Sequence, residues 1–479
     1  MPSHAQNQPR TRTALHDNGE DVEMNNMKSE NSNNKRCVEK SDVLVHENEV
    51  FPAEVFSSSN ESNTSSNKLP AITMAEVPDG GLSAWLVVLG AMFAVISSFG
   101  YIYSWGVFQS YYQQVLLKDN TASEIAWIGS TQSALGLMPT VLAGRLLDKG
   151  ILKIPFFISS VFLVGTTVLV GQCTKYWHFL LCQGIVVGLA CGMIVGPAIS
   201  IIPHWFKQKR GTATAFMAIG SSIGGIIFPI AVRKLIPKVG FPWTMRIVAL
   251  LLFCSLVIPN LTLATRLPPK AHSGGILDFA SFKKPPFAAY GLTTLFAFMG
   301  IYTVLTYIDI SAVSAGISPD MSFYLVSIAN AGSGVGRISG GYMSDRYGAI
   351  TIIAPMTVFT GLATYAWPFA RSEKGFVAIA AVYGFLSGAY VSGFIVPVFM
   401  LGDTVDIGRR VGMFLCIAAV GALCGPPISG AIFKVSGGFE GVGFYAGTMT
   451  IMASLFMILT KRLVLESYYK KKDHDSTPE

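Results

Sequence analysis

Long apolar segments constrain this chain more than any other feature of its sequence. Apolar runs of roughly 20 residues, the length that crosses a bilayer, recur about twelve times between Ala84 and Leu465, separated by short polar stretches. Only 13% of the residues are charged, about half the share found in soluble domains. The sequence therefore predicts an all-α membrane protein with twelve transmembrane helices.

The expected spans are short enough to follow one another through tight loops. They lie near residues 84–105, 125–147, 154–172, 177–200, 211–232, 246–264, 287–311, 322–343, 349–369, 375–400, 411–433 and 442–463. An even number of spans puts both ends of the chain on one side. That side holds 18 Lys and Arg residues against 9 on the other, and basic loops favour the cytoplasm. We expect a multi-pass protein of the plasma membrane with cytoplasmic termini.

The first 80 residues differ in composition from the rest of the chain. They are rich in Asn, Ser and Glu, with seven Lys or Arg against thirteen Asp or Glu, and they lack the apolar core of a signal peptide. Such a composition cannot bury enough apolar surface to fold by itself. We expect a disordered cytoplasmic tail, so that glycosylation motifs at Asn60 and Asn63 stay unmodified.

An internal repeat predicts how the helices are grouped. Four positions recur at an offset of 200: Gly184, Gly188, Gly192 and Pro197 match Gly384, Gly388, Ser392 and Pro397. Arg210 and Gly211 are echoed by Arg410 and Gly412, and the loop 144–150 is echoed by 341–348 at an offset of 197. The repeat predicts two pseudo-symmetric halves of six helices with a cavity between them. The expected parts are a tail at 1–80, halves at 81–264 and 287–465, a linker at 265–286 and a C-terminal tail at 466–479.

Small residues at every fourth position allow close approach of helix backbones in a membrane. They permit the halves to rock against each other, and they equally suit static helix packing.

Signals of enzymatic chemistry do not occur in the sequence. It contains no phosphate-binding loop, no nucleophile with a neighbouring base and no carboxylate pair at catalytic spacing. The seven cysteines are scattered, mostly within apolar runs, and suit small buried residues better than disulfides or metal ligands. We expect no enzyme, no cofactor, no metal site and no nucleic-acid partner, and a lipid bilayer as the surroundings.

Arg337 is the charge whose position most needs an explanation. It lies among Gly, Ser and apolar residues in the eighth span, and a membrane-embedded arginine normally faces protein, water or a ligand. At an offset of 197 its counterpart is Thr140, so the arginine is not part of the duplicated scaffold. Either it faces the cavity, or its long side chain reaches the cytoplasmic surface about six residues away.

Helical spacing provides neighbours for this arginine. Asn330, Ser333 and Arg337 are three and four residues apart and therefore share one helix face. In the first span, Tyr103 could present an aromatic surface to the cavity, or equally to the membrane interface.

The seventh span has a polar face of the same kind. Tyr302, Thr306 and Asp309 share it, and Asp309 is the only carboxylate within that span. We expect Asp309 to be a site for a proton or a counter-charge, unless it is simply hydrated at the outer end of the helix.

The repeated loop resembles a signature of the major facilitator superfamily. In each half a Gly is followed by an Asp four residues later, a basic residue and a second Gly. The resemblance implies that these residues latch one closed arrangement of the bundle, although a solvated loop that obeys the positive-inside rule would look similar. The residues expected to serve conformational change are Gly144, Arg145, Asp148, Arg210, Asp345, Arg346 and Arg410.

Two further stretches resemble the monocarboxylate transporter branch, and its fungal members more than its animal ones. These are the Asp-Gly-Gly motif at 79–81 and the aromatic-Phe-basic stretch at 205–210. The resemblance implies that Arg337 pairs with a substrate carboxylate. Ser333 stands where the family has an aspartate, and Tyr103 stands where animal members have a lysine, so the family's proton coupling does not follow.

The expected function is secondary active or facilitative transport of a small, monocarboxylate-like organic anion or a related metabolite by alternating access. The expected substrate-binding residues are Arg337, Ser333, Asn330, Tyr103, Tyr302 and Asp309. One alternative is facilitated transport of a larger or neutral metabolite, such as a vitamin like riboflavin, or efflux of a secondary metabolite. A second alternative is a membrane sensor that transports nothing. Symport with protons stays open, and we expect a monomer.

Overall fold

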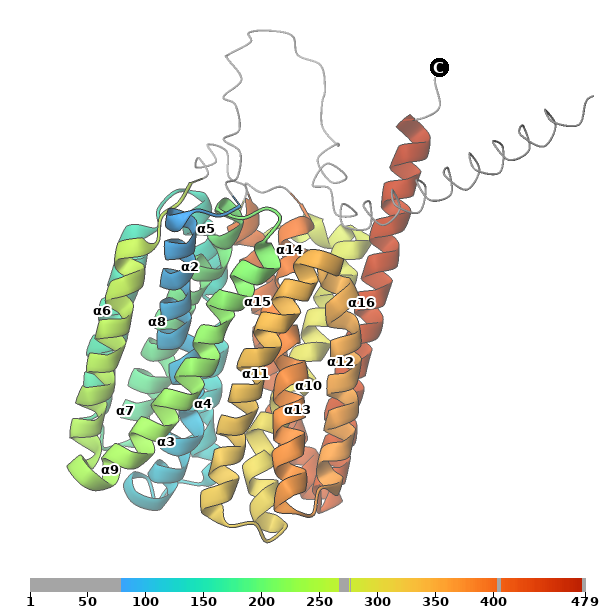
Figure 1. The fold of residues 1–479 in the computed structure, drawn as a ribbon. Helices are drawn as coiled ribbons and strands as arrows, with labels where there is room; N and C mark the ends of the chain where they lie inside the picture. Colours follow the sequence, from blue (N-terminus) through green and yellow to red (C-terminus); the bar gives the residue numbers. More distant parts are fainter. Residues whose placement is uncertain (1–78, 267–274, 276, 403–405, 476–479) are drawn as a thin grey trace, which may run out of the picture. The chain divides into compact units, whose positions relative to one another are not determined.

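The computed structural model describes residues 79–266, 275, 277–402 and 406–475, and every regular element in those ranges is helical. Nine helical stretches among them are long and apolar enough to cross a membrane. One of the nine, α9 (Arg210–Thr262), contains two spans. Two further spans are α4 with α5, which a turn interrupts, and α11, which is rich in Gly and Ser. The predicted all-helical twelve-span fold is confirmed (Figure 1).

The first six spans are formed by the elements up to Thr262, in which η marks a short π or 3₁₀ segment. They are α2 (Leu82–Val95), η2 (Ile96–Gly100), α3 (Trp105–Tyr111), η3 (Tyr112–Leu116), α4 (Ala122–Leu135), α5 (Thr140–Asp148), α6 (Lys153–Val170), α7 (Tyr176–Phe179), η4 (Leu180–Val187), α8 (Gly188–Ser200), η5 (Ile202–His204) and α9. The predicted tail, apart from Asp79 and Gly80, lies outside the described residues.

The other six spans begin after the linker, whose described part contains η6 (Phe279–Lys283). They are α10 (Pro285–Ser314), α11 (Pro319–Tyr347), α12 (Ala349–Ala366), η7 (Trp367–Phe369), α13 (Glu373–Gly393), α14 (Val396–Met400), α15 (Ile407–Ser436) and α16 (Phe439–Asp475). The predicted C-terminal tail is therefore helical as far as Asp475. α2 begins and α16 ends at the same end of the bundle, which we call the terminal side (Figure 1).

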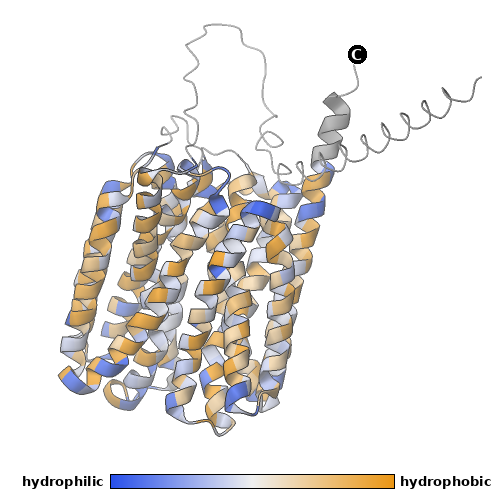
Figure 2. Ribbon diagram, in the orientation of Figure 1, coloured by the Kyte–Doolittle hydropathy of each residue, from blue (hydrophilic) through white to orange (hydrophobic). Residues whose placement is uncertain are grey.

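Hydropathy follows the pattern of a protein surrounded by lipid. Hydrophilic residues gather at the two ends of the helices, and apolar residues cover the middle (Figure 2). Large apolar side chains such as Phe157 and Phe162 on α6, and Leu250 and Phe253 on α9, are more than half exposed. In water this exposure would be unfavourable, whereas a hydrocarbon environment accommodates it.

The loop predicted between the fifth and sixth spans is nearly absent. Helical structure continues through 233–245 and turns at Gly240, which has φ 76° and ψ 166°. Pro237 and Pro242 flank this glycine, and a residue without Cβ adopts the left-handed φ at little cost. The prediction of a loop here was wrong because a single Gly reverses the chain.

The first and second spans are interrupted near the middle of the bundle. In the first, π segments flank a short turn that contains Tyr103 and Ser104. In the second, residues 136–139 form a turn between α4 and α5, while the matching helix of the other half, α11, is continuous. Such π segments often occur where a helix presents functional groups.

Small residues bring the two halves together at two helix pairs, α5 with α15 and α9 with α11. A Cβ added to Gly144 would lie 2.1 Å from the carbonyl oxygen of Gly408, and one added to Gly211 would lie 2.7 Å from that of Gly341. No larger residue fits at such approaches. Figure 1 shows α9 and α11 side by side.

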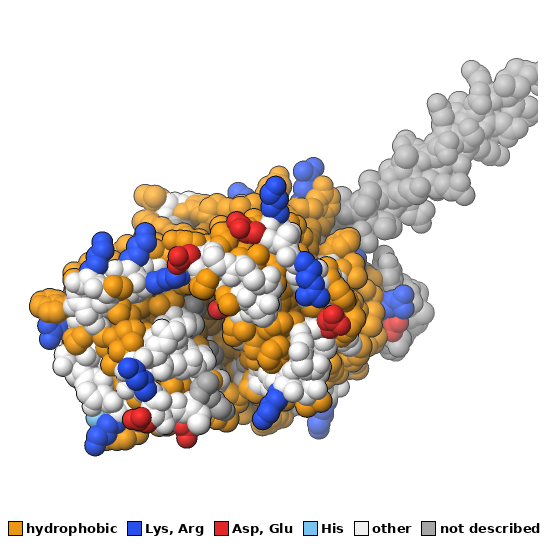
Figure 3. Space-filling view, turned by 90° about the horizontal axis from the view of Figure 1, so that it is seen from below, with side chains coloured by type: hydrophobic (Ala, Val, Ile, Leu, Met, Phe, Trp, Pro, Cys, Tyr) orange, Lys and Arg blue, Asp and Glu red, His pale blue; other side chains and the backbone are white. Residues whose placement is uncertain are grey.

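The halves are closed against each other on the terminal side. There α13 and α14 pack on α9, and α15 packs on α8. By contrast, α10 makes few contacts with α2 or α3 among the described residues. Figure 3 shows the opposite face of the molecule, where charged side chains lie mostly around the edge and the middle is hollowed.

Candidate functional site

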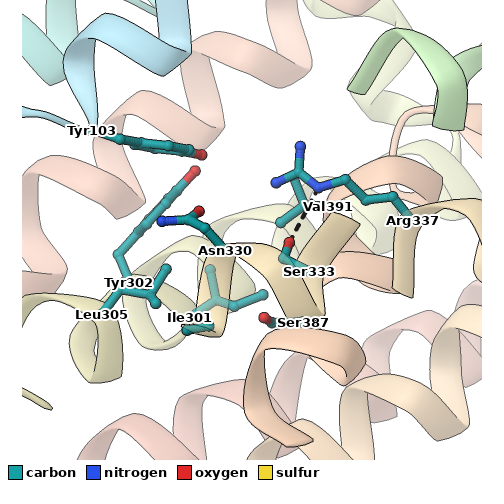
Figure 4. A pocket seen from close by; sticks show the side chains of 10 residues that line it. Tyr103, Ile301, Tyr302, Leu305, Asn330, Ser333, Arg337, Ser387 and Val391 are labelled. Carbon is teal, nitrogen blue, oxygen red and sulfur yellow. Dashed lines mark hydrogen bonds between the residues drawn. The ribbon is translucent and has the colours of Figure 1, made fainter. Parts of the chain in front are cut away.

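A small cavity lies between the halves. Most of its wall comes from α10, α11 and α13 of the second half, and the interrupted first span contributes Tyr103 (Figure 4). Its lining residues are Tyr103, Ile301, Tyr302, Leu305, Ala329, Asn330, Ser333, Arg337, Ser387 and Val391.

Arg337 supplies the only formal charge in this lining. Its side chain is 3% exposed, so it does not reach the membrane surface. Nε donates to the hydroxyl of Ser333 one turn earlier, at 3.2 Å. Nη1 donates across the interface to the carbonyl oxygen of Ala218 and the hydroxyl of Ser221, both on α9.

The positive charge of Arg337 has no negative partner in the described part of the chain. None of the carboxylates there lies within ion-pairing distance of its guanidinium. A buried charge normally requires a counter-charge because its hydration is lost on burial. The neutral oxygens of Ser221, Ser333 and Ala218 satisfy hydrogen bonds and leave the charge uncompensated.

Two tyrosines from opposite halves form the part of the cavity that faces the guanidinium. Tyr103 from the first span and Tyr302 from α10 direct their hydroxyl groups toward each other, and the guanidinium of Arg337 points toward this pair (Figure 4). Phe99 stacks on Tyr103 with ring centroids 6.4 Å apart. The cavity therefore combines one cation with flat aromatic surface and hydroxyl groups.

Five of the six expected substrate-binding residues line this one cavity: Tyr103, Tyr302, Asn330, Ser333 and Arg337. Sequence reasoning missed the small and aliphatic part of the wall. Ser387 is an example, and it lies between Gly384 and Gly388 of the repeated glycine pattern. That pattern was the available signal.

Asp309 is the expected residue that does not line the cavity. It follows Tyr302 by seven residues on α10, about 10 Å along the helix axis. Its Oδ1 accepts a hydrogen bond from the amide of Ile310 at 2.7 Å.

Asp148 connects the two halves on the terminal side. Its carboxylate accepts hydrogen bonds from the amides of Gly408 at 2.9 Å and Arg409 at 2.8 Å, at the start of α15. Free amides and the positive end of the helix dipole make a helix start a favourable place for a carboxylate.

Asp345 makes the matching contact in the other half. It accepts hydrogen bonds from the amides of Gly211 at 2.6 Å and Thr212 at 2.7 Å, at the start of α9. The contacts equate Gly211 with Gly408, an offset of 197. The sequence repeat instead matched Gly211 with Gly412, at an offset of 201.

The arginines expected to serve conformational change have different surroundings. Arg145 lies 3.7 Å from Asp406, whereas Arg346 is exposed over the ring of Tyr347. Arg210 and Arg410 are buried, and their Nε atoms donate to the carbonyl oxygens of Phe206 and Val398 respectively. The structure thus brings Gly144, Asp148 and Arg145 into one interface, and Gly211 and Asp345 into its counterpart.

A residue of the Asp-Gly-Gly motif has a role that sequence reasoning did not assign. Oδ1 of Asp79 accepts hydrogen bonds from the amides of Lys207, Gln208 and Lys209, at 2.5, 2.6 and 3.4 Å. These amides directly precede α9. Asp79 therefore fixes the turn that presents the start of α9 to Asp345.

Burial changes the acidity of both inter-half carboxylates. Desolvation raises the pKa of Asp148 from 3.8 to about 6, opposed by the hydrogen bonds from Arg409 and Gly408. Desolvation also raises the pKa of Asp345, against hydrogen bonds from Thr212 and Gly211. Each carboxyl is therefore a stronger base when the terminal side is closed.

Comparison with known proteins identifies the family. A family model of the Major Facilitator Superfamily matches residues 94–401 and 291–477. MFS transporter asaE of Aspergillus flavus is 37% identical over 391 residues, which cover 81% of this chain and 88% of that protein. The aspyridones efflux protein apdF of Emericella nidulans is 32% identical, with 81% and 79% covered. The fujikurins efflux protein of Gibberella fujikuroi is 35% identical, with 81% and 84% covered.

Solved structures agree with this at the level of the fold. The human organic anion transporter MFSD10 (TETRAN) has a TM-score of 0.60 at 14% identity, covering 80% of this chain and all of that one. FucP of E. coli, in the outward conformation, has a TM-score of 0.60 at 14% identity, with 79% and 99% covered. The fold is that of a multi-pass membrane transporter. The chain belongs to the major facilitator superfamily.

Proposed function

We propose that this protein exports an organic metabolite that carries an acidic group, and that Arg337 binds that group in the cavity. The observation that supports this is a buried cationic side chain in a cavity without a negative partner among the described residues. The guanidinium is planar and can hold a carboxylate or another delocalised oxyanion through two parallel hydrogen bonds. An anionic substrate would supply the missing counter-charge.

The proposed route is alternating access between the two halves. The cavity lies at their interface, closed on the terminal side by α8, α9, α14 and α15. The excess of basic residues in the loops of that side supports cytoplasmic termini. On that orientation, the structure corresponds to a state closed to the cytoplasm, and export requires a second state in which the terminal side opens.

Efflux of a metabolite fits the relatives better than uptake of a simple monocarboxylate. The names of two relatives, at 32% and 35% identity, refer to efflux of aspyridones and of fujikurins. In addition, Ser333 and Tyr103 stand where the monocarboxylate transporter family has the aspartate and the lysine that the resemblance links to proton coupling. Coupling to protons, with Asp309 as the carrier, remains a separate proposal, as do the monomeric state and the plasma membrane location.

Transport of a neutral metabolite is the second candidate. It is favoured by the hydrogen bonds of Arg337, because Ser221, Ser333 and the carbonyl of Ala218 already accept three of its five N–H groups. On this alternative, the aromatic and aliphatic wall selects the substrate and Arg337 has a structural role.

An export assay separates the two candidates. Cells that express the protein are loaded either with an aromatic carboxylic acid or with its neutral amide. The amount of each compound that the cells retain is then compared with the amount retained by cells that express Arg337→Ala. The proposal predicts export of acids only, and its loss in Arg337→Ala. Arg371→Ala, at an exposed arginine, is the control for expression, and cells with this variant should export the acids normally. Export of the amides, unaffected by Arg337→Ala, would support the neutral candidate.

A further inference from the structure

The hydrogen bonds of Arg337 connect the two halves of the transporter. The residue belongs to α11 of the second half, yet both hydrogen bonds from Nη1 go to α9 of the first half, at Ala218 and Ser221. Only the bond from Nε stays within its own helix, at Ser333. The residue expected to bind substrate is thus also a bridge between the parts that must move.

The residues of this bridge are buried. Ser221 and Arg337 are 2% and 3% exposed. Close by along the same helix pair, a Cβ on Gly334 would lie 3.7 Å from Cβ of Ser222, an ordinary van der Waals contact. Hydrogen bonds from a cation are stronger than neutral ones, and burial strengthens them further.

The geometry of a guanidinium makes this bridge incompatible with bidentate binding of an acid. A carboxylate takes one N–H from each of two neighbouring nitrogens, either Nη1 with Nη2 or Nε with Nη2. Nη1 has two hydrogens, which Ala218 and Ser221 accept, and the single hydrogen of Nε goes to Ser333. Neither edge therefore has two N–H groups free, and at least one of these bonds must break.

We propose that Ser221 is a positioning residue whose hydroxyl competes with the acidic group of the substrate for Arg337, so that substrate binding releases a bond between the halves. This inference rests on the proposed function, since it assumes an anion at Arg337. It adds a means by which occupancy of the cavity reaches α9. Binding of the anion withdraws the guanidinium from α9 and makes separation of α9 from α11 easier.

The test measures binding of benzoate to the purified full-length chain, with benzamide as the neutral control. The readout is the benzoate concentration that gives half of the maximal rise in unfolding temperature. Ser221→Ala and Ser221→Gly both delete the competing hydroxyl. Ser222→Ala is the matched control, because Ser222 is equally buried on the same helix and its Oγ has no partner among the described residues. Arg337→Ala removes the anion site.

The inference predicts half-saturation at three- to tenfold lower benzoate in both Ser221 variants, at the wild-type concentration in Ser222→Ala, and no response in Arg337→Ala. If the Ser221 variants need as much benzoate as Ser222→Ala, or more, competition is refuted while the response lost in Arg337→Ala still supports the anion site. If the wild type responds to benzoate no more than to benzamide, the anion site and the competition are both refuted.

Discussion

Asp148 and Asp345 make the same contact on the two sides of the interface between the halves. Each lies at the terminal side and accepts hydrogen bonds from two successive backbone amides at the start of a helix of the other half, α15 for Asp148 and α9 for Asp345. The contacts exist only while the terminal side is closed. Opening that side therefore has to break four hydrogen bonds to carboxylates.

Asp148→Asn is expected to favour the closed arrangement of the terminal side. The amide of Asn keeps one acceptor for the amides of α15, and it removes a buried charge whose desolvation raises the pKa of Asp148. Distances between spin labels at the exposed positions 115 and 310, at the other ends of the first and seventh spans, should shift toward the population in which the terminal side is closed. Asp119→Asn, at an exposed residue outside the interface, should leave the distances unchanged.

Acid is expected to favour closure of the terminal side. The pKa of Asp148 is raised by burial to about 6 in the closed arrangement, and it returns toward 3.8 when the carboxyl is hydrated. The closed arrangement therefore binds the proton more tightly, so its population rises as the pH falls from 7.5 through 6 and is lost as the pH rises again.

The same spin labels report this change at pH 7.5, 6 and 5. Asp148→Asn should remove most of the pH dependence of the closed population. The dependence that is left comes from Asp345, because burial also raises the pKa of that carboxyl. If the open population grew as the pH falls, this would contradict the claim that protonation of Asp148 favours closure of the terminal side.

Gly144→Ala is expected to impair both stability and transport. The new methyl group would meet the carbonyl oxygen of Gly408 at 2.1 Å, so the α5 and α15 backbones must separate, and overpacking of this kind costs about 1–3 kcal/mol. Thermal unfolding and efflux measure the two effects. Gly165→Ala on α6 is the control, because a Cβ there meets nothing within 4 Å; equal effects of both substitutions would argue against the close approach.

Sequence periodicity was sufficient to group the second-half wall of the cavity. Asn330, Ser333 and Arg337 share a helix face, and the structure places all three in the lining. The same reasoning included Asp309, which shares the face of Tyr302 but lies two helical turns farther along. Periodicity gives the direction of a side chain and says little about the depth of a cavity.

Contacts between the halves could not be predicted from the sequence. Ser221 and Ala218 are 116 and 119 residues from Arg337, and their meeting depends on how α9 crosses α11. The repeat indicated two halves without indicating which faces pack together. It matched Gly211 with Gly412, whereas the contacts of Asp148 and Asp345 pair Gly211 with Gly408.

Tyr302→Phe is expected to reduce selectivity while preserving the cavity. The ring keeps its aromatic surface, and the lost hydroxyl faces Tyr103 and the guanidinium (Figure 4). Removal of one hydrogen-bonding group should raise the KM for an acidic substrate by roughly three- to tenfold, corresponding to about 0.5–1.5 kcal/mol. Competition experiments between an acid and its amide provide the measurement, and an unchanged preference would exclude a role for this hydroxyl.

The central claim is that the guanidinium of Arg337 holds the acidic group of the substrate. The direct measurement is transport of an exported acid into proteoliposomes by wild type, Arg337→Ala and Arg337→Lys, at matched protein content. Because an ammonium group does not reproduce the planar fork, the account predicts at least a tenfold loss of transport in both variants. Transport by Arg337→Ala at the wild-type rate and KM would contradict it.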